Sequence, residues 1–203
     1  MPGHDDDLAL LITAARAAGG IAMRYFKNAP QVWDKGGDEG PVTEADLAVN
    51  AMLEPMLRGA RPGYGWLSEE SPDTPARLTC DDLFLIDPID GTRAFIAGDS
   101  SFSHSLAIAR QGQITAAVVY LPAKDRLYAA QARGPATCNG AVIAVSDRAD
   151  SNGASLLTPK ANLDAALWTE VPPVTRGFRA SVAYRLCLVA DGSFDGMLSL
   201  RQA

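Results

Sequence analysis

Cysteine is scarce in this chain of 203 residues, and its three cysteines, Cys80, Cys138 and Cys187, lie far apart in the sequence. No two of them have the Cys-x-x-Cys spacing of a metal knuckle, and an odd number argues against a disulfide framework. The pattern favours free thiols in a reducing compartment. A cytoplasmic location is therefore expected.

Long apolar runs and a basic surplus are also missing. No stretch approaches the roughly 20 apolar residues that a membrane-spanning helix needs. Residues 1–7 carry three aspartates and lack the basic start of a secretory signal. The 18 Lys and Arg residues are outnumbered by 24 Asp and Glu, for a net charge of -6. This balance argues against a nucleic-acid polymer as a partner, because there is no excess positive charge to displace its counterions.

The overall composition is that of an ordinary folded protein. Hydrophobic residues make up 47% and charged residues 21% of the chain, which excludes a disordered chain or a fibre. The length suits one domain or two compact ones. We expect a first α/β domain over residues 1–136 and a second, partial α/β domain over residues 137–203.

Apolar periodicity predicts the helices of the first half. Apolar residues at helical spacing indicate an amphipathic helix over residues 7–27. A second helix is expected to begin at Thr43, because Thr43 and Asp46 have the spacing of a capping box. Pro55 is expected to kink this helix or end its regular part. Between the two helices, the glycines, proline and charges of residues 35–41 predict a mobile loop, suited to act as a lid.

Short apolar segments bounded by turn residues predict strands. We expect these strands over residues 65–68, 83–87, 104–110, 114–121, 126–130, 155–158 and 194–200. Further helices are expected over residues 162–168 and 181–190. Hairpin turns are predicted at Gln111-Gly112, residues 122–125 and Asn139-Gly140. This alternation of elements predicts the α/β fold class.

Residues 85–96, Leu-Ile-Asp-Pro-Ile-Asp-Gly-Thr-Arg-Ala-Phe-Ile, carry the most informative chemistry. A buried strand is expected to end at Asp87, and the turn after it carries Asp90, so the two carboxylates converge. Converged carboxylates repel each other unless cations lie between them, and oxygen ligands favour Mg²⁺. Backbone N–H groups of Gly91 and Thr92, at the start of a helix, could hold a phosphate. The alternative interpretation is an ordinary Asp-Gly turn after a strand.

Three further carboxylates lie at the ends of other elements. Glu69 and Glu70 follow a predicted strand, and Asp46 lies at the start of a helix. Each has a simpler interpretation, as a solvated loop or as a capping residue. So many carboxylates at element ends exceed what stability requires, and together they predict a metal site.

The chain contains Thr-Glu-Ala-Asp (43–46), Ser-Glu-Glu-Ser (68–71) and Asp-Pro-Ile-Asp-Gly-Thr-Arg-Ala-Phe (87–95), followed by residues 117–122, 138–140 and 187–192. In this order, these segments resemble the inositol monophosphatase family. The family comprises Mg²⁺-dependent, lithium-sensitive phosphomonoesterases and includes 3′(2′),5′-bisphosphate nucleotidases and fructose-1,6-bisphosphatases. The resemblance implies a layered α+β sandwich of the sugar-phosphatase type. It also implies a small phosphate monoester as substrate, either inositol monophosphate or 3′-phosphoadenosine 5′-phosphate.

The resemblance also implies roles for individual residues. Thr92, hydrogen-bonded to Asp46, would orient and deprotonate the attacking water, while Glu69 would bind both metal and water. Asp87 would bridge two Mg²⁺ ions, and the N–H groups of Gly91 and Thr92 would donate to phosphate. Two or three ions are expected in an intact member. The implied metal ligands are Glu69, Asp87, the carbonyl of Ile89, and Asp90.

Other features are less specific. Arg185 lies on the helix whose start approaches the substrate in relatives, so it is a candidate substrate-binding residue; the alternative is a surface salt bridge. His104 and Ser105 follow residues 87–92, the loop of the predicted metal site (the metal loop), and are expected to be ordinary sheet positions. A homodimer is expected.

In members of the family, a stretch like residues 194–203 is followed by a Trp-Asp motif whose aspartate completes the second metal site, and the sequence given ends before that motif. We expect the C-terminal part to be truncated here and the natural protein to continue into that motif. The alternative from another functional class is a non-catalytic metal- or phosphate-binding protein that lacks this aspartate.

Overall fold

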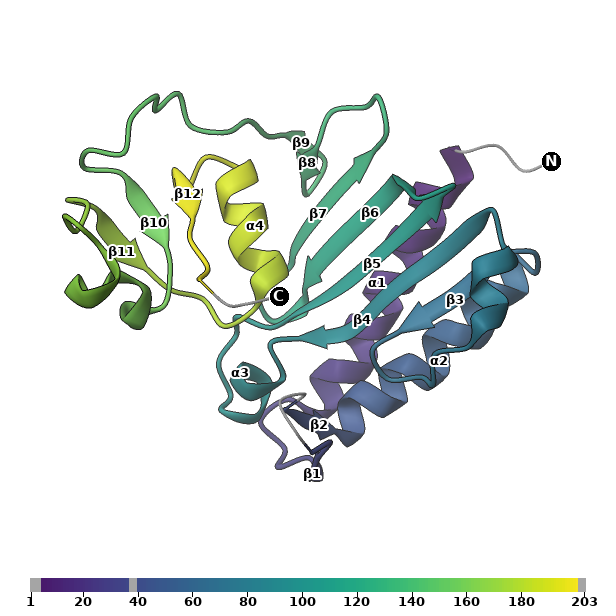
Figure 1. The fold of residues 1–203 in the computed structure, drawn as a ribbon. Coiled ribbons are helices and arrows are strands. Elements are labelled where there is room, and N and C mark those ends of the chain that lie inside the picture. The colour runs from purple at the N-terminus through teal and green to yellow at the C-terminus, as the bar shows by residue number, and fades with distance from the viewer. Residues whose placement is uncertain (1–4, 37–39, 201–203) are drawn as a thin grey trace.

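A seven-stranded sheet forms the centre of the protein in a computed structural model, which describes residues 5–36 and 40–200 (Figure 1). The first two strands are parallel, and every other neighbouring pair is antiparallel. In spatial order its strands are β3 (Gly65–Ser68), β4 (Asp82–Asp90), β5 (Ser103–Arg110), β6 (Gln113–Leu121), β7 (Arg126–Gln131), β8 (Thr137–Cys138) and β9 (Ala141–Val142).

The remaining strands form two smaller sheets. The hairpin of β1 (Val32–Asp34) and β2 (Pro41–Thr43) precedes the second helix. A parallel three-stranded sheet contains, in spatial order, β11 (Thr175–Gly177), β10 (Ser155–Leu157) and β12 (Gly196–Met197).

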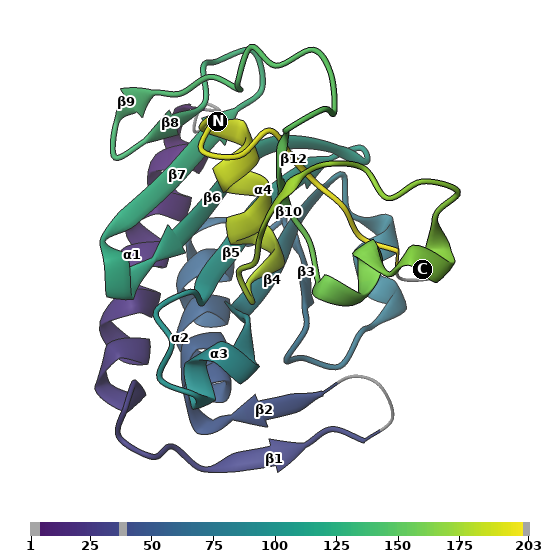
Figure 2. The same ribbon diagram turned by 90° about the vertical axis from the view of Figure 1, so that its left-hand side faces the viewer.

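Helices lie on both faces of the large sheet (Figure 2). The large sheet can be covered on both faces because alternate residues of its strands point to opposite sides and are apolar on both. In β6, Val118 and Tyr120 pack in one core with α1 (Asp5–Tyr25) and α2 (Glu44–Ala60). Val119 and Leu121 point the other way, to a second core that contains α4 (Val182–Ala190) and β10. The predicted layered α/β sandwich is thereby confirmed. One layer contains α1 and α2, the next is the large sheet, and α4 and the small parallel sheet cover its other face.

The second helix begins as predicted. The Thr43 hydroxyl accepts hydrogen bonds from the backbone N–H groups of Ala45 and Asp46, at 3.2 and 3.4 Å, and Asp46 Oδ2 accepts from the Thr43 N–H at 2.8 Å. This reciprocal pair is the capping box that the spacing indicates.

Of the two expectations for Pro55, the end of the regular helix is wrong, because α2 continues through it to Ala60. A kink at Pro55 stays a prediction. Pro55 and Ala51, whose carbonyl loses its helical partner, both lie on the exposed face. Water can therefore bind that carbonyl, while the buried side chains of Leu53 and Leu57 hold the helix on the sheet from both sides of the proline.

Most predicted strands and turns occur within one or two residues of the expected positions. β3 has the predicted bounds, whereas β4 runs on to Asp90 instead of ending at Asp87. Asn139 and Gly140 have φ angles of 50° and 82°, the left-handed conformation that a tight hairpin turn requires. The turn at Gln111 and Gly112 has the same conformation, with φ angles of 48° and 78°.

Two predicted elements of the second half are wrong. Instead of a helix over residues 162–168, two short 3₁₀ turns occur, because the Asp164 carboxylate binds the Ala166 N–H and holds its own backbone extended. The strand predicted over residues 194–200 is only Gly196–Met197, since its neighbour β10 is itself three residues long. The sequence interpretation also missed β1, β2 and β11.

Several other expectations concern the chain as a whole. The three cysteines are free and half-buried. Among the described residues, no helix is long and apolar enough to cross a membrane. Residues 37–39, the tip of the predicted lid, lie outside the described residues. The domain boundary at 136/137 stays a prediction, and the sheet around β7 includes β8 and β9 beyond it.

Candidate active site

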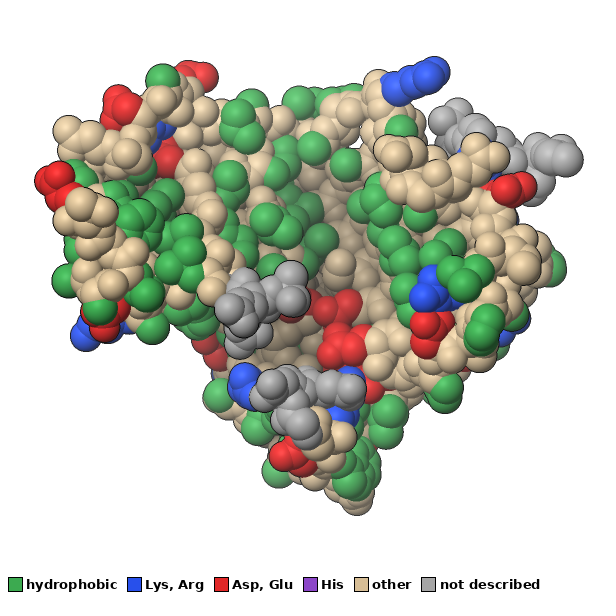
Figure 3. Space-filling view, in the orientation of Figure 1, with side chains coloured by type: hydrophobic (Ala, Val, Ile, Leu, Met, Phe, Trp, Pro, Cys, Tyr) green, Lys and Arg blue, Asp and Glu red, His purple; other side chains and the backbone are tan. Residues whose placement is uncertain are grey.

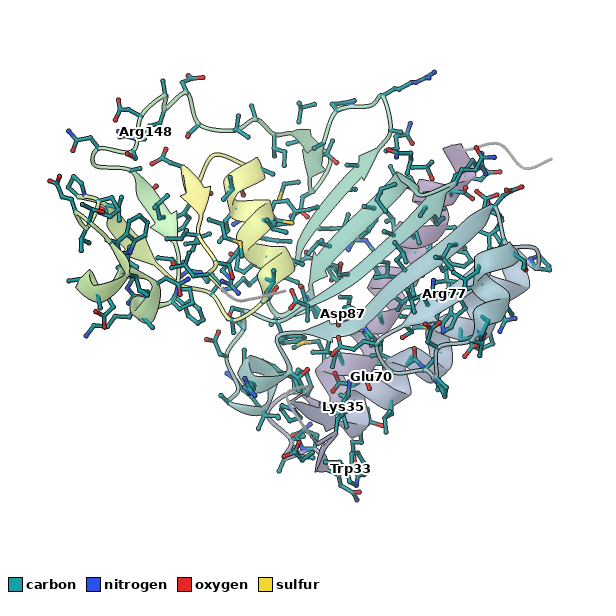
Figure 4. The ribbon with its side chains drawn as sticks, viewed as in Figure 1. Trp33, Lys35, Glu70, Arg77, Asp87 and Arg148 are labelled. Carbon is teal, nitrogen blue, oxygen red and sulfur yellow. The ribbon has the colours of Figure 1, made fainter. Side chains whose placement is uncertain are left out.

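The predicted carboxylates gather at one edge of the large sheet. Because β3 and β4 are parallel, Glu69 and Glu70, which follow β3, lie beside Asp87 of β4. Figure 3 shows acidic side chains in a hollow of this face, at the place where Figure 4 labels Glu70 and Asp87. The start of α2 brings Asp46 to the same site, where its carboxylate receives a hydrogen bond from Thr92.

Asp87 is the least satisfied member of this cluster. Its Oδ1 atom is buried and has no hydrogen-bond partner among the described residues. Burial, together with the smaller effect of the charges of Asp90 and Glu69, raises the pKa of Asp87 from 3.8 to about 8. The site therefore favours a proton, or another positive charge, on this carboxylate.

Lys35 supplies positive charge to the neighbouring glutamates. Its ammonium lies 2.6 Å from Glu70 Oε1 and 3.5 Å from Glu69 Oε1, and Figure 4 shows it reaching toward Glu70 from the β1–β2 hairpin. The side chains of Lys35 and Glu70 are only 14% and 6% exposed, against 50% for Glu69. Burial lowers the pKa of Lys35, but the hydrogen bond and charge of Glu70 outweigh it, so this pKa lies above its usual value. The sequence interpretation missed Lys35, although it is the only lysine between Lys27 and Lys124.

Asp90 is bound by the first turn of α4. Its Oδ2 accepts from the Ser181 hydroxyl and the Ala183 N–H, both at 2.6 Å, and its Oδ1 accepts from the Val182 N–H at 3.2 Å. The positive end of the helix dipole stabilises a carboxylate in this position. Ser181, whose role in holding Asp90 was not predicted, also caps α4 through the Tyr184 N–H.

Gly91 is required where β4 meets α3 (Thr92–Ile96). Its φ of 94° lies in the left-handed region, and a Cβ atom would come within 3.2 Å of the Ser181 backbone nitrogen. Glycine therefore allows the metal loop to pass close to the start of α4.

Thr92 and Asp46 form the hydrogen bond that the resemblance implies. The Thr92 hydroxyl lies 3.3 Å from Asp46 Oδ1 and 3.0 Å from the carbonyl of Ile89. Burial raises the pKa of Asp46 from 3.8 to about 6, against the opposing hydrogen bonds from Thr43. Asp46 can therefore hold or release a proton near neutral pH.

Asn50 fixes the turn that carries the two glutamates. Its amide nitrogen donates to the Glu70 carbonyl at 3.3 Å and to the Ser71 hydroxyl at 2.9 Å, and its oxygen accepts from the Ser68 hydroxyl at 2.7 Å. Asn50 was not predicted. The sequence spacing could have identified Asn50, because it lies four residues after Asp46 and therefore on the same face of α2.

Arg185 is buried, and does not lie on the surface as the alternative interpretation expects. It is 7% exposed, its Nε donates to the Ser181 carbonyl at 3.4 Å, and its guanidinium lies 5.4 Å from the ring centre of Phe178. The surface alternative is therefore wrong. A role for Arg185 in substrate binding stays a prediction.

His104 lies directly beneath the metal loop, on β5. Its ring is fully buried, and its Nδ1 is hydrogen-bonded to the Pro88 carbonyl, while Nε2 has no partner in the described part of the chain. An ordinary sheet position would leave both ring nitrogens satisfied, and this expectation is met for Nδ1 but not for Nε2. Burial lowers the pKa of His104 from 6.5 to about 4, against a smaller opposing effect of the Pro88 carbonyl.

This pKa predicts a loss of stability in acid. His104 takes up a proton near pH 6.5 in the unfolded chain but only near pH 4 in the folded protein. The contribution of the neutral ring to the free energy of unfolding is therefore complete above pH 6.5 and is lost as the pH falls toward 4. The loss amounts to about 3 kcal/mol. In urea denaturation, the difference in unfolding free energy between wild type and His104→Asn should shrink by that amount from pH 7 to pH 4. Parallel pH profiles of the two proteins would contradict this prediction.

The donor set can be compared with the needs of a metal ion. Among residues 5–36 and 40–200, no three Asp, Glu, His or Cys side chains are grouped closely enough to chelate one ion. Asp90 is turned toward α4, and the glutamates toward Lys35. The unpartnered Asp87 oxygen and the all-oxygen donors nevertheless fit a hard cation such as Mg²⁺.

Comparison with known proteins decides the family. Residues 4–203 match the inositol monophosphatase family. The chain belongs to this family. An inositol-1-monophosphatase of Mesorhizobium japonicum is 38% identical over 144 residues, which make up 70% of this chain and 53% of that protein. The 3′(2′),5′-bisphosphate nucleotidase CysQ of Salmonella typhimurium is 35% identical over 122 residues, or 59% of this chain and 50% of that protein.

The family fold is also found in solved structures. The extragenic suppressor protein suhB of Bartonella henselae superimposes with a TM-score of 0.84 at 28% identity, over 95% of this chain and 77% of that one. The present chain spans about half the length of the two curated relatives above. The predicted membership of the inositol monophosphatase family is thus confirmed.

Proposed function

We propose that this protein hydrolyses a small soluble phosphate monoester with the help of Mg²⁺. The observation that carries the proposal is the buried, unpartnered Asp87 oxygen, in a cluster of carboxylates whose charges raise the pKa of Asp87. Such a cluster costs stability without a bound cation, so its presence favours a function that needs one.

Each carboxylate has a part in the proposed site. Glu69, Asp87, the Ile89 carbonyl and Asp90 would hold the metal. When bound, Mg²⁺ would lower the pKa of a coordinated water and neutralise phosphate charge. The contact of Lys35 with Glu69, at 3.5 Å, is the weaker of its two contacts with the glutamates, which leaves Glu69 available as a ligand. Lys35 can remain on Glu70, its closer partner at 2.6 Å.

Proton transfer is assigned to Thr92 and Asp46. The Thr92 hydroxyl would accept the proton of the attacking water while its own proton passes to Asp46 Oδ1, 3.3 Å away. A carboxylate with a pKa of about 6 can take that proton and return it to solvent near neutral pH. The N–H groups of Gly91 and Thr92 would orient the phosphate.

The substrate class rests on the relatives. The names inositol-1-monophosphatase and 3′(2′),5′-bisphosphate nucleotidase belong to proteins that are 38% and 35% identical to parts of this chain. Inositol monophosphate and 3′-phosphoadenosine 5′-phosphate are therefore the proposed candidates, with Arg185 as a candidate substrate-binding residue. Two or three Mg²⁺ ions and a homodimer belong to the same proposal through the family resemblance, and a cytoplasmic location belongs to it through the three free cysteines.

A phosphate-release assay tests this function. The purified protein is incubated with inositol 1-phosphate, 3′-phosphoadenosine 5′-phosphate and histidinol phosphate, each with MgCl₂ or with EDTA. We expect release from at least one substrate that requires Mg²⁺ and that is absent for the Asp87→Asn variant. If the wild-type protein releases phosphate from every substrate no faster than the Asp87→Asn variant does, the proposal is refuted and a non-catalytic metal- or phosphate-binding protein is favoured.

A further inference from the structure

A β-bulge lies in the strand that carries the proposed metal ligands. In the antiparallel pair of β4 and β5, Asp87 is opposite Ser105 and Asp90 is opposite Ser103. Two residues of β4, Pro88 and Ile89, therefore face the single residue His104. A bulge leaves its extra residue unpaired and turns the neighbouring side chains, so its exact shape decides where Asp87, the Ile89 carbonyl and Asp90 point.

The side chain of His104 fills the place where the ladder is interrupted. Its ring is fully buried, 6.3 Å from the ring of Phe102 at an interplanar angle of 80°, and 6.4 Å from that of Tyr120. Its Nδ1 is bonded to the Pro88 carbonyl. A carbonyl can only accept, so the neutral ring carries its proton on Nδ1 and leaves a lone pair on Nε2. This tautomer agrees with the absence of an Nε2 partner among the described residues.

Fixing the Pro88 carbonyl also fixes the next one. Successive carbonyls of an extended chain point in opposite directions. With the Pro88 carbonyl held toward β5, the Ile89 carbonyl is directed to the other side, where it lies 3.0 Å from the Thr92 hydroxyl. Proline has no N–H that could form a compensating ladder bond, so the side chain of His104 supplies what the backbone of the bulge cannot.

We propose that His104 is a positioning residue, whose Nδ1–H holds the Pro88 carbonyl so that Asp87 and the Ile89 carbonyl face the metal. This inference rests on the proposed function, because it concerns the metal site assigned there. Partners of this kind, which orient the ligands without touching the metal, change metal affinity by about 10–100-fold when they are removed.

Three substitutions separate the hydrogen bond from simple filling of space. The amide nitrogen of His104→Asn can occupy the place of Nδ1 and donate to Pro88. The amide of His104→Gln lies at the place of Nε2, and His104→Leu fills the volume without any donor. Calorimetric titration with Mg²⁺ should show affinity weakened by about 10–100-fold for the Leu and Gln variants and close to wild type for the Asn variant.

The opposite order would overturn the inference. If His104 only fills the core, both stability and Mg²⁺ affinity should follow side-chain volume, and the Asn variant, with the largest cavity, should be the weakest. Equal affinity of the Leu variant and wild type would likewise refute the positioning role. Failure of wild type itself to bind Mg²⁺ would refute the proposed function, and the positioning role with it.

A measurement on the wild-type protein covers the case in which the variants do not fold. The ¹⁵N chemical shifts of His104 near pH 7 should show the tautomer with its proton on Nδ1. A proton on Nε2 would contradict the hydrogen bond to Pro88, whatever the Mg²⁺ affinity is.

Discussion

Replacing Asp87 with asparagine is expected to abolish phosphatase activity and to stabilise the metal-free protein. Asp87 is a proposed metal ligand, and losing its charge should remove several kcal/mol of metal-dependent stabilisation of the transition state, a loss of at least about 10³-fold in phosphate release. The same substitution removes one of several mutually repelling carboxylates from a buried position. The gain in stability and the loss of activity are measured on one protein.

The stability effect should depend on pH in a defined direction. Because the pKa of folded Asp87 is raised to about 8, above the ordinary 3.8, the protonated form supports folding, and this support is lost as the pH rises from 3.8 through 8. In EDTA, Asp87→Asn should exceed wild type in unfolding free energy above pH 8, by about 5 kcal/mol at most. The difference should vanish toward pH 4.

A matched control lies just before the same strand. Asp81 is exposed and immediately precedes β4, at the end far from the site, so Asp81→Asn removes an equal charge without touching the cluster. It should leave both activity and the pH profile unchanged. Near-normal phosphate release by Asp87→Asn would refute the metal assignment.

Replacing Thr92 with alanine should lower turnover while leaving Mg²⁺ affinity unchanged. Thr92 is proposed to take a proton from the attacking water and pass its own to Asp46, whose Oδ1 lies 3.3 Å away. Loss of a proton-transfer group reduces the rate by roughly 10²–10⁴-fold. The measurements are kcat from phosphate release and Mg²⁺ affinity from calorimetry.

The hydroxyl itself can be tested by rescue. Thr92→Ser keeps an oxygen at the same position and should restore most of the turnover. A comparable loss of Mg²⁺ binding in Thr92→Ala would mean that the threonine supports the Ile89 carbonyl, 3.0 Å from its hydroxyl, and is structural.

Elements governed by neighbours in the chain were predictable from the sequence. The capping box of Thr43 and Asp46, the turn at Asn139-Gly140 and the strand β3 each depend on a few adjacent residues, and the structure has all three. The failures have a common cause in competing contacts. Asp164 binds a nearby N–H instead of continuing a helix, and β12 can be no longer than its partner β10 allows.

The sequence by itself determined the family motifs, the order of the two long helices and the main strands of the large sheet, and the convergence of Glu69, Asp87 and Asp90 on one edge of that sheet. Only the tertiary structure decided which partner each polar group has: Lys35 binds Glu70, α4 binds Asp90, and His104 binds the Pro88 carbonyl. The physical reason is that local patterns set the path of the backbone, whereas a buried polar group is satisfied by whatever the packing of distant segments brings within hydrogen-bond distance. These three contacts join residues 35, 93 and 16 positions apart.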